Sequence, residues 1–284
     1  TLPGGEKLVL PDSTAQVGHN PIPIAYKQTL KMFKDKKLSD KIFNLGNMTF
    51  QDSEINRETL MRTSGKLLNN LKIIDNNNLS HIDNRLTTLM NNFYSDKGDL
   101  NNQHNYTKFY HSLFEKISHN NLKVFEVGIG SINTNITFHM KYSNENYKPL
   151  ASLKAWEEYF PNSEIYGADI DKEIIQSVNR IKTYYVDMTK KETIIKMWKS
   201  INNKMDIIID DGFHNYEANI NFFNYSYEML KENGYYIIED VHRKPSNIKK
   251  FDNFFKEIKI NYQIIDLPHK NNISDNCLIL IQKK

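Results

Sequence analysis

The sequence predicts an α/β fold with a doubly wound, mostly parallel β-sheet, and three observations indicate it. Strand-like and helix-like segments alternate between residues 123 and 258. The first strand, 123–127, runs into Gly128-Ile129-Gly130, and such a glycine-rich turn is typical of the first ligand loop of an open sheet. The last two strands, 262–267 and 278–282, have no helix between them, so a hairpin with one antiparallel edge strand is expected.

The part of the chain before this alternation is expected to be mostly helical. Residues 1–23 are rich in proline and glycine and should be irregular. Apolar residues then recur at helical spacing in three segments. We therefore expect residues 1–93 to form a helical N-terminal region, serving as a lid or in oligomerisation, and residues 94–284 to form the α/β domain. The three expected helices cover 24–43, 52–74 and 81–93.

Each element of the α/β domain follows from its apolar pattern. A helix over 104–117 carries aromatic residues close to helical spacing. The strand 205–210 contains three consecutive isoleucines, which suits a strand that is covered on both faces. The helix expected over 216–231 should end at Asn233-Gly234. The other strands are expected at 164–169, 181–186 and 235–239, and the other helices at 151–160, 172–180, 190–201 and 248–258.

The composition argues against several classes of function. The 284 residues carry a net charge of +3 with no block of lysines or arginines, so no nucleic-acid partner is expected. No apolar run approaches the roughly 20 residues of a membrane helix, so no membrane partner is expected. The single cysteine, Cys277, lies in an apolar run and should be a small buried hydrophobic residue. One cysteine allows no internal disulfide, which suits a cytoplasmic protein.

Acidic residues at the ends of successive strands indicate a nucleotide-type ligand. Glu126 lies in the first strand, Asp169 ends the second, Asp187 follows the third and Asp210 ends the fourth. Asp169 can accept hydrogen bonds from two ribose hydroxyls, and Asp187 would lie near an adenine. The alternative is that these carboxylates cap loops and helices.

A dinucleotide-binding enzyme fits this pattern less well. Its fingerprint requires a third glycine, where this chain has Asn133, and an acidic residue roughly 20 positions further on. Asp169 lies about twice that far away. The terminal hairpin is also foreign to that layout.

A second acidic group predicts a metal site. Residues 210–214 read Asp-Asp-Gly-Phe-His, and Glu239-Asp240 follow the next strand. Because the two strands should be neighbours, the two segments are expected to meet above the sheet. Asp211, Glu239 and Asp240 would then offer hard carboxylate ligands that suit Mg²⁺ or Mn²⁺ better than zinc.

His214 is the candidate general base. It lies three residues beyond Asp211 and can face the same cavity if the segment coils, and an imidazole is suited to proton transfer near neutral pH. The alternative interpretation is that Asp211 caps the following helix and His214 is an ordinary loop residue. His242 is the second candidate for the base.

At these residues the chain resembles the class I S-adenosylmethionine-dependent methyltransferases, and most closely the metal-dependent sugar O-methyltransferases of macrolide biosynthesis (mycinamicin type). The resemblance covers roughly residues 95–284. The segments that carry it are Ser95-Asp96-Lys97-Gly98 with His104, Tyr106 and Tyr110; Glu126-Val127-Gly128-Ile129-Gly130; Ser152-Leu153 with Trp156 and Tyr159-Phe160-Pro161; Tyr166-Gly167-Ala168-Asp169-Ile170-Asp171; Asp210-Asp211-Gly212-Phe213-His214; and Glu239-Asp240.

The resemblance implies a Rossmann-like seven-stranded sheet with an antiparallel last strand. It implies S-adenosylmethionine and Mg²⁺ as cofactors, with Asp211, Glu239 and Asp240 as metal ligands and His214 as the base. The chain departs from the family at Leu150-Ala151, where glycines are expected beside the cofactor. The predicted cofactor-binding residues are Lys97, Tyr106, Glu126, Gly128, Gly130, Ser131, Asp169, Ile170, Asp187, Met188 and Asp210.

The activity that the resemblance implies is methyl transfer to a hydroxyl of a sugar or sugar nucleotide. The richness of the chain in asparagine, lysine and isoleucine is typical of an AT-rich bacterial genome and directs the prediction to surface-polysaccharide precursors. A homo-oligomer is expected. Two alternatives stay open: a metal-independent methyltransferase acting on a nitrogen or another hydroxyl, and a non-catalytic protein that binds only the cofactor.

Overall fold

The computed structural model describes residues 71–73, 84–99, 104–137, 139–141, 143–267, 269, 271–272 and 274–284. All of them belong to one compact unit, Ser64–Lys284. The expected irregular segment 1–23, the helix over 24–43 and most of the helix over 52–74 lie outside the described residues. None of the described helices is long and apolar enough to cross a membrane.

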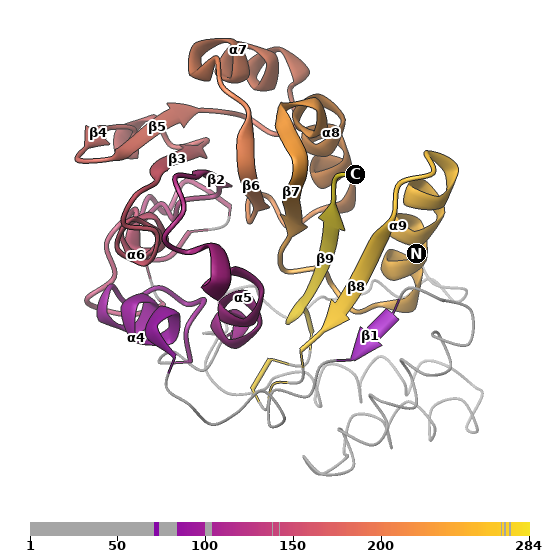
Figure 1. Ribbon diagram of the computed structural model, residues 1–284, viewed down its shortest axis with the longest axis horizontal. Coiled ribbons are helices and arrows are strands. Elements are labelled where there is room, and N and C mark those ends of the chain that lie inside the picture. The colour runs from indigo at the N-terminus through magenta and orange to yellow at the C-terminus, as the bar shows by residue number, and fades with distance from the viewer. Residues whose placement is uncertain are drawn as a thin grey trace, which may run out of the picture. The chain divides into compact units, whose positions relative to one another are not determined.

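The described strands form one sheet in the order β1-β8-β9-β7-β6-β2-β3-β5-β4 (Figure 1). Seven of these strands have five or more residues, and β1 and β4 are short strands at the two edges. Neighbouring strands are parallel except where β9 pairs with β7 and β8, and where β4 pairs with β5. The strands are β1 (Leu71–Ile73), β2 (Lys123–Val127), β3 (Glu164–Asp169), β4 (Ser177–Val178), β5 (Ile181–Tyr185), β6 (Met205–Asp210), β7 (Leu230–Ile238), β8 (Tyr262–Asp266) and β9 (Cys277–Gln282).

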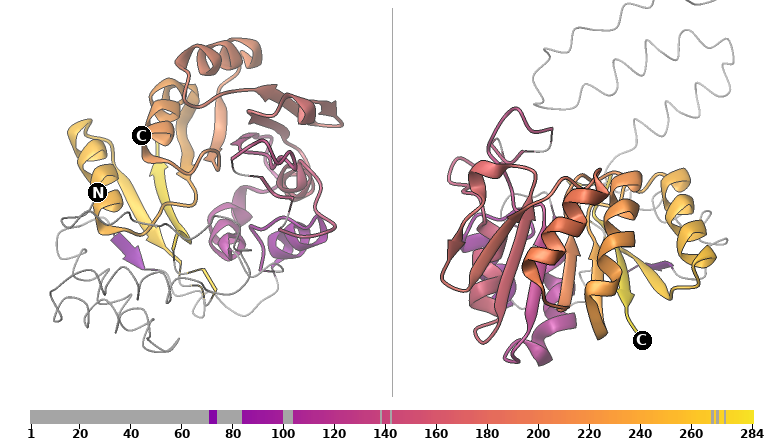
Figure 2. Two further views of the ribbon diagram at one scale, coloured as in Figure 1. Left: turned by 180° about the vertical axis from the view of Figure 1, so that it is seen from behind. Right: turned by 90° about the horizontal axis from the view of Figure 1, so that it is seen from above.

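Helices cover both faces of the sheet, which confirms the predicted doubly wound α/β architecture (Figure 2). One face carries α4 (Arg85–Asn92), α5 (Tyr106–Phe114) and α6 (Ala151–Tyr159), and the other carries α7 (Lys191–Ile201), α8 (Tyr216–Ser226) and α9 (Pro245–Glu257). Three short 3₁₀ helices complete the list: η1 (Glu115–Ile117), η2 (Lys172–Ile174) and η3 (Tyr227–Met229).

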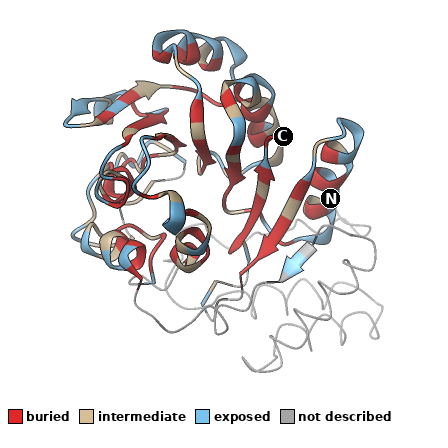
Figure 3. Cartoon of the chain, viewed as in Figure 1, coloured by how far each residue is buried: buried red, intermediate tan, exposed pale blue. Residues whose placement is uncertain are grey.

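Each face of the sheet has its own apolar core, and most residues of the central strands are buried (Figure 3). On the face covered by α7 and α8, Phe125 of β2 packs against Trp198 and Phe222, with ring centroids 4.7 and 6.1 Å apart. On the opposite face, Trp156 of α6 packs edge-on against Phe114 of α5. The two cores fix β2 at the centre of the molecule, where its carboxyl end faces the candidate site.

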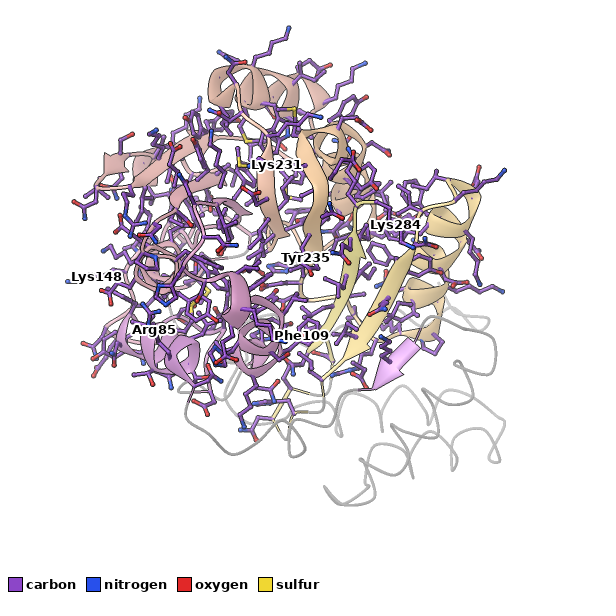
Figure 4. The ribbon with its side chains drawn as sticks, in the orientation of Figure 1. Arg85, Phe109, Lys148, Lys231, Tyr235 and Lys284 are labelled. Carbon is purple, nitrogen blue, oxygen red and sulfur yellow. The ribbon has the colours of Figure 1, made fainter. Side chains whose placement is uncertain are left out.

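The helix α4 is fixed to α6 through an arginine. Arg85, labelled in Figure 4, donates to the carbonyl oxygens of Glu158 and Tyr159 at 2.5 and 3.4 Å. The side chain of Asn84 caps α4 by accepting from the backbone N–H of Thr87. The helix expected over 81–93 is thus present over 85–92 and packs on the α/β domain.

The helix expected over 172–180 is wrong. Only a single 3₁₀ turn forms, and β4 then pairs antiparallel with β5. The reason is Asn179, which adopts a left-handed backbone with φ of 52° and turns the chain between Val178 and Ile181. Asparagine tolerates this conformation in tight hairpin turns, and the β-branched residues before it favour a strand.

The helix expected over 216–231 is too long. It ends at Ser226, one 3₁₀ turn follows, and Leu230 already pairs with Met205 in the sheet. Asn233 has a left-handed φ of 64°, but with Gly234 it produces an irregularity within β7 rather than a helix end.

Two further expectations need correction. Residues 71–73, expected to be the end of a helix, form β1 and pair parallel with β8. The terminal hairpin of β8 and β9 is antiparallel as predicted, but its antiparallel strand is not at the edge. β9 lies between β7 and β8, where its carbonyl and amide groups are paired on both sides. Cys277 at its start is fully buried, as expected.

Phe125→Ala should destabilise the fold because it removes a fully buried ring from the centre of one core. We expect the free energy of unfolding to fall by about 3–5 kcal/mol, measured by urea denaturation. The control is Ile195→Ala, at a side chain of α7 that is 37% exposed, which should change stability by less than about 0.5 kcal/mol. Equal losses in both variants would contradict the assignment of β2 to the core.

Candidate active site

A cavity of about 750 Å³ lies at the carboxyl ends of the central parallel strands. Both groups of residues predicted from the sequence line it, so the expected ligand loop and the expected metal site share one space. The predicted residues in its wall are Lys97, Gly128, Gly130, Ser131, Asp169, Ile170, Asp187, Met188, Asp211, His214 and Asp240.

The glycine turn lets β2 approach β6 closely. Gly128 has a left-handed φ of 86°, and a Cβ atom there would lie 1.9 Å from the carbonyl oxygen of Asp211. Gly130 has a φ of 79°, and its Cβ atom would lie 1.6 Å from the hydroxyl of Tyr147. At Gly128 only glycine fits both the conformation and the space, and at Gly130 the left-handed backbone favours glycine. The turn therefore exposes its backbone to the cavity beside Asp211.

Asp169 fixes the glycine turn to the end of β3. Its two carboxylate oxygens accept from the backbone N–H groups of Ile129 and Asp171, both at 2.9 Å. The side chain of Asp171 in turn accepts from the hydroxyl of Ser131 at 2.5 Å. Burial raises the pKa of Asp169, although the backbone hydrogen bonds oppose that rise. The Asp169 carboxylate therefore binds backbone groups of the loops, as expected if the strand-end carboxylates cap loops and helices. It also lines the cavity.

Asp187 plays a similar part after β5. It accepts from the backbone N–H and the hydroxyl of Thr189, at 3.0 and 2.6 Å, and pairs with Lys190 at 2.7 Å. Burial opposes its charge, but the bonds from Lys190 and Thr189 outweigh burial and lower the pKa of Asp187. Its neighbour Met188 is buried against Gly212, and Ile170 on β3's side of the cavity is 45% exposed.

Leu150 shows how the chain keeps a glycine-like loop without the expected glycine. Its φ is 68°, in the left-handed region, and its N–H donates to the carbonyl oxygen of Ile129 at 2.9 Å. The Leu150 side chain is fully buried. Packing therefore holds this residue in a conformation that glycine adopts more readily.

Lys97 lies at the centre of a buried carboxylate cluster. Its ammonium is 2.6 Å from Asp211 Oδ2, 2.5 Å from Glu239 Oε2 and 3.7 Å from Glu126 Oε1. Burial opposes the charge of Lys97, but Asp211, Glu126 and Glu239 outweigh burial and raise the pKa of the ammonium well above its usual value. The remaining bonds of the cluster come from Ser152 Oγ and Trp156 Nε1 to Glu126, both at 2.6 Å, and from Tyr110 Oη to Glu239 at 2.5 Å.

Asp240 faces the cavity between two imidazoles and a tyrosine. Its Oδ1 accepts from the hydroxyl of Tyr106 at 2.5 Å and lies 3.4 Å from His104 Nδ1, while its Oδ2 lies 3.3 Å from His214 Nδ1. Burial would raise the pKa of Asp240, but the two histidines and Tyr106 outweigh it and lower that pKa. Asp240 therefore stays a carboxylate in the cavity wall.

Among the described residues, Asp211, His214 and Asp240 form a group whose candidate ligand atoms all lie within 4.8 Å of one another. The side chains are 15–22% exposed, so an ion can reach them from the cavity. His214 and Asp240 both have left-handed backbones, with φ of 49° and 52°. Such strained conformations persist where the surrounding structure fixes them, and they cluster at functional sites. The two carboxylates suit a hard divalent cation, and the imidazole of His214 lies beside them.

In sequence the chain resembles sugar O-methyltransferases, and no model of a protein family matches it. It is 29% identical over 147 residues to the 8-demethyl-8-(2-methoxy-alpha-L-rhamnosyl)-tetracenomycin-C 3'-O-methyltransferase of Streptomyces olivaceus, covering 52% of this chain and 34% of that protein. It is 28% identical over 139 residues to the mycinamicin VI 2''-O-methyltransferase of Micromonospora griseorubida, covering 49% and 32%. The chain thus spans about a third of the length of these relatives.

The fold matches a solved structure as well. The MycE methyltransferase from the mycinamycin biosynthetic pathway, in complex with Mg and SAH, superposes with a TM-score of 0.53 at 20% identity, covering 72% of this chain and 56% of that chain. Its complex with Mg, SAH and mycinamycin VI gives a TM-score of 0.53 at 21% identity, covering 71% and 55%.

The chain has the class I methyltransferase fold. The internal antiparallel strand β9, between β7 and β8, belongs to this fold, which explains why the predicted antiparallel strand is not at an edge. The resemblance to macrolide sugar O-methyltransferases that the motifs indicated is confirmed by the relatives above.

Four predicted site residues lie beneath the cavity rather than in its wall. Glu126 and Glu239 face Lys97, and the Tyr106 hydroxyl supports Asp240. Asp210 is fully buried below Gly212, and burial raises its pKa to about 7. Glu126, Glu239 and Tyr106 therefore support the residues of the cavity wall from beneath.

Asp211 does not cap the next helix, because Asn215 does so by accepting from the backbone N–H groups of Glu217 and Ala218.

Sequence reasoning gave no role to several residues that complete the site. Tyr110 and Trp156 bind the cluster carboxylates, His104 supports Asp240, and Tyr147 closes on Gly130. The first three belong to the segments that carry the family resemblance, which was the available signal. Tyr147 lies in the Asn-rich loop and has no such signal.

Gly128→Ala should disrupt the site because the new methyl group would overlap the backbone of Asp211. We expect the free energy of unfolding to fall by at least about 1–3 kcal/mol from the left-handed backbone alone, measured by urea denaturation. The control is again Ile195→Ala, at an exposed side chain of α7 outside the cavity wall, which should change stability by less than about 0.5 kcal/mol. A Gly128→Ala variant as stable as the natural chain would contradict the close approach of the two strands.

Proposed function

We propose that the protein is an S-adenosylmethionine-dependent, Mg²⁺-dependent O-methyltransferase that acts on a sugar hydroxyl. The observation that carries the proposal is the shared cavity, in which the glycine turn and Asp169 lie beside Asp211, His214 and Asp240. A methyl donor at the turn and an alcohol at the acidic group would be adjacent there. The sugar O-methyltransferase activity of the relatives supports the same reaction.

The glycine turn and the strand-end carboxylates would bind the methyl donor. Asp169 uses one bond on each oxygen for the loop, and a carboxylate has about four acceptor positions. It can therefore still accept from the ribose hydroxyls. Asp187 and Met188 would border the adenine, and the Gly128 backbone leaves space for the amino-acid part. The sequence also predicts cofactor binding by Lys97, Tyr106 and Ser131, and this role stays a proposal.

Asp211 and Asp240 would hold the divalent cation. Glu239, the third ligand expected from the sequence, stays a prediction, because its two oxygens pair with Lys97 and Tyr110 beneath the cavity. When bound, the cation would lower the pKa of a sugar hydroxyl and fix its position. Asp240 Oδ2 also lies 3.3 Å from His214 Nδ1, so Asp240 orients the imidazole beside the acceptor.

His214 would take the proton of the sugar hydroxyl. The hydroxyl oxygen then attacks the methyl carbon of the sulfonium in line, the carbon–sulfur bond breaks, and the electron pair stays on sulfur to give neutral S-adenosylhomocysteine. Holding the oxygen and the methyl group at near-attack distance contributes about 7–11 kcal/mol to lowering such barriers. The proton remains on His214 until it passes to solvent.

The described wall of the cavity favours a glycoside over a sugar nucleotide as the acceptor. Lys97 is the one lysine or arginine among the described lining residues, and its ammonium faces three carboxylates. A diphosphate would therefore meet the carboxylates of Asp96, Asp240 and Asp275 without a protein cation of its own. Surface-polysaccharide precursors stay a prediction from composition, because the relatives act on sugars of small natural products.

The direct test incubates the full chain with S-adenosylmethionine, MgCl₂ and a panel of glycosides and sugar nucleotides, and detects methylation by mass spectrometry. Methyl transfer to a sugar hydroxyl that requires Mg²⁺ supports the proposal. Transfer that is equally fast without metal supports the metal-independent alternative. Binding of S-adenosylmethionine without transfer to any acceptor supports the non-catalytic alternative.

His214→Ala should lose turnover and keep cofactor binding. A general base contributes roughly 10²- to 10⁴-fold to the rate, so kcat should fall by that factor while the SAH affinity stays unchanged. The matched control is His242→Ala, because His242 is exposed and lies outside the described cavity wall. If His242→Ala loses turnover and His214→Ala retains it, the base is His242.

Metal binding to the same variant separates two roles of His214. If His214 is the base, His214→Ala binds Mn²⁺ with the affinity of the natural chain. A weaker affinity would show instead that His214 is a metal ligand, which the 4.8 Å group also permits.

Removal of the metal should stop the reaction, because the cation would lower the pKa of the sugar hydroxyl and fix its position in the proposed mechanism. Asp211→Asn weakens the site by one charge, so activity should require a much higher Mg²⁺ concentration. Rates measured against Mg²⁺ concentration check both expectations. Full turnover in excess chelator would refute the metal role.

A further inference from the structure

The loop before α5 delivers the ammonium of Lys97 to a fixed place. The N–H of Ser95 donates to the carbonyl oxygen of Met90 in α4 at 2.9 Å, and Asn91 donates to Asp99 at 2.9 Å. Gly98 packs directly against the side chain of Asn91. The loop is thus tied to α4 on both sides of Lys97, whose side chain is 2% exposed.

The three carboxylates around this ammonium come from three adjacent strands. Glu126 lies in β2, Asp211 follows β6 and Glu239 follows β7, and these strands are neighbours in the sheet. The ammonium donates to Asp211 Oδ2 and Glu239 Oε2, while Glu126 Oε1, at 3.7 Å, is an ion-pair partner beyond hydrogen-bond distance. Lys97 therefore connects the carboxyl ends of the central strands directly under the cavity.

The inner carboxylates are satisfied by protein groups alone. Glu126 accepts from Ser152 and Trp156, and Glu239 accepts from Tyr110 on the oxygen that does not face Lys97. Both glutamates are 0–1% exposed. Without a cation here, like-charge repulsion and the loss of hydration would strongly disfavour the charged carboxylates.

We propose that Lys97 is a resident counter-ion of the metal site. Its ammonium holds Asp211 and Glu239 in place before a divalent cation binds, and it repels that cation once bound. Lys97 is thus a positioning residue that keeps the site assembled without metal and limits its metal affinity. This inference rests on the proposed function only in treating the cavity as the metal site.

The proposal differs from the role that the sequence assigned to Lys97. A lysine that contacts the methyl donor would lose cofactor affinity when neutralised, and the metal affinity would not change. A resident counter-ion gives the opposite pattern, because one positive charge beside a divalent cation costs binding energy at the short distances found here.

The test compares the full natural chain with Lys97→Met, which keeps the length of the side chain and removes its charge. Thermal unfolding is measured in chelator and with Mn²⁺, Mn²⁺ binding by electron paramagnetic resonance, and SAH binding by calorimetry. We expect Lys97→Met to melt at a lower temperature in chelator, to regain stability with Mn²⁺, and to bind Mn²⁺ about tenfold more tightly or more. SAH affinity in the presence of Mn²⁺ should stay close to that of the natural chain.

A charge-balanced variant keeps the proposal testable if Lys97→Met does not fold in chelator. Lys97→Met combined with Glu126→Gln removes one positive and one negative charge, neither from a proposed metal ligand. It should recover much of the stability and return the Mn²⁺ affinity toward that of the natural chain. Mn²⁺ affinity in the double variant equal to that in Lys97→Met would contradict the electrostatic account.

Two failures are distinguishable. A natural chain that binds no Mn²⁺ overturns the proposed metal dependence. A natural chain that binds Mn²⁺, together with a Lys97→Met variant that binds it no more tightly, overturns the counter-ion role alone. A Lys97→Met variant that loses SAH affinity and keeps the natural Mn²⁺ affinity assigns Lys97 to the cofactor instead.

Discussion

The pairing of Lys97 with three buried carboxylates is the interaction on which the site depends. Parallel strands bring their carboxyl ends to one edge of the sheet, and in this chain three adjacent strands end in or next to acidic side chains. Charges of one sign cannot be buried together without a partner of the other sign. Lys97 supplies that partner from outside the sheet, and one of the three, Asp211, lines the cavity together with Asp240.

The elements that could be predicted from the sequence are those whose buried residues follow a local apolar pattern. β2, β3 and β6 have the expected bounds because each is a short apolar run that ends at a glycine or an aspartate. The failures are of a different kind. Asn179 turns the chain into a hairpin, and Leu230 joins the sheet by pairing with Met205, so both depend on partners that a local pattern does not contain.

The candidate site likewise contains residues that could be placed from the sequence and residues that could not. Asp211, His214 and Asp240 could be placed together because the order of the strands was predictable, and the structure brings them within one group. The partners of Lys97 could not be predicted from the sequence, because Asp211 and Glu239 lie 114 and 142 residues away along the chain. Leu150 is a similar case: its left-handed backbone is maintained by tertiary packing, although the residue type argues against it.

The position of β9 has a consequence for how the sheet forms. β7 and β8 run parallel but do not pair, since β9 separates them with hydrogen bonds on both sides. During synthesis β7 and β8 leave the ribosome first, and each exposes an open edge until residues 277–282 emerge. The region beyond β7 therefore closes late and through contacts distant in sequence, the kind that slow folding and expose strands to aggregation.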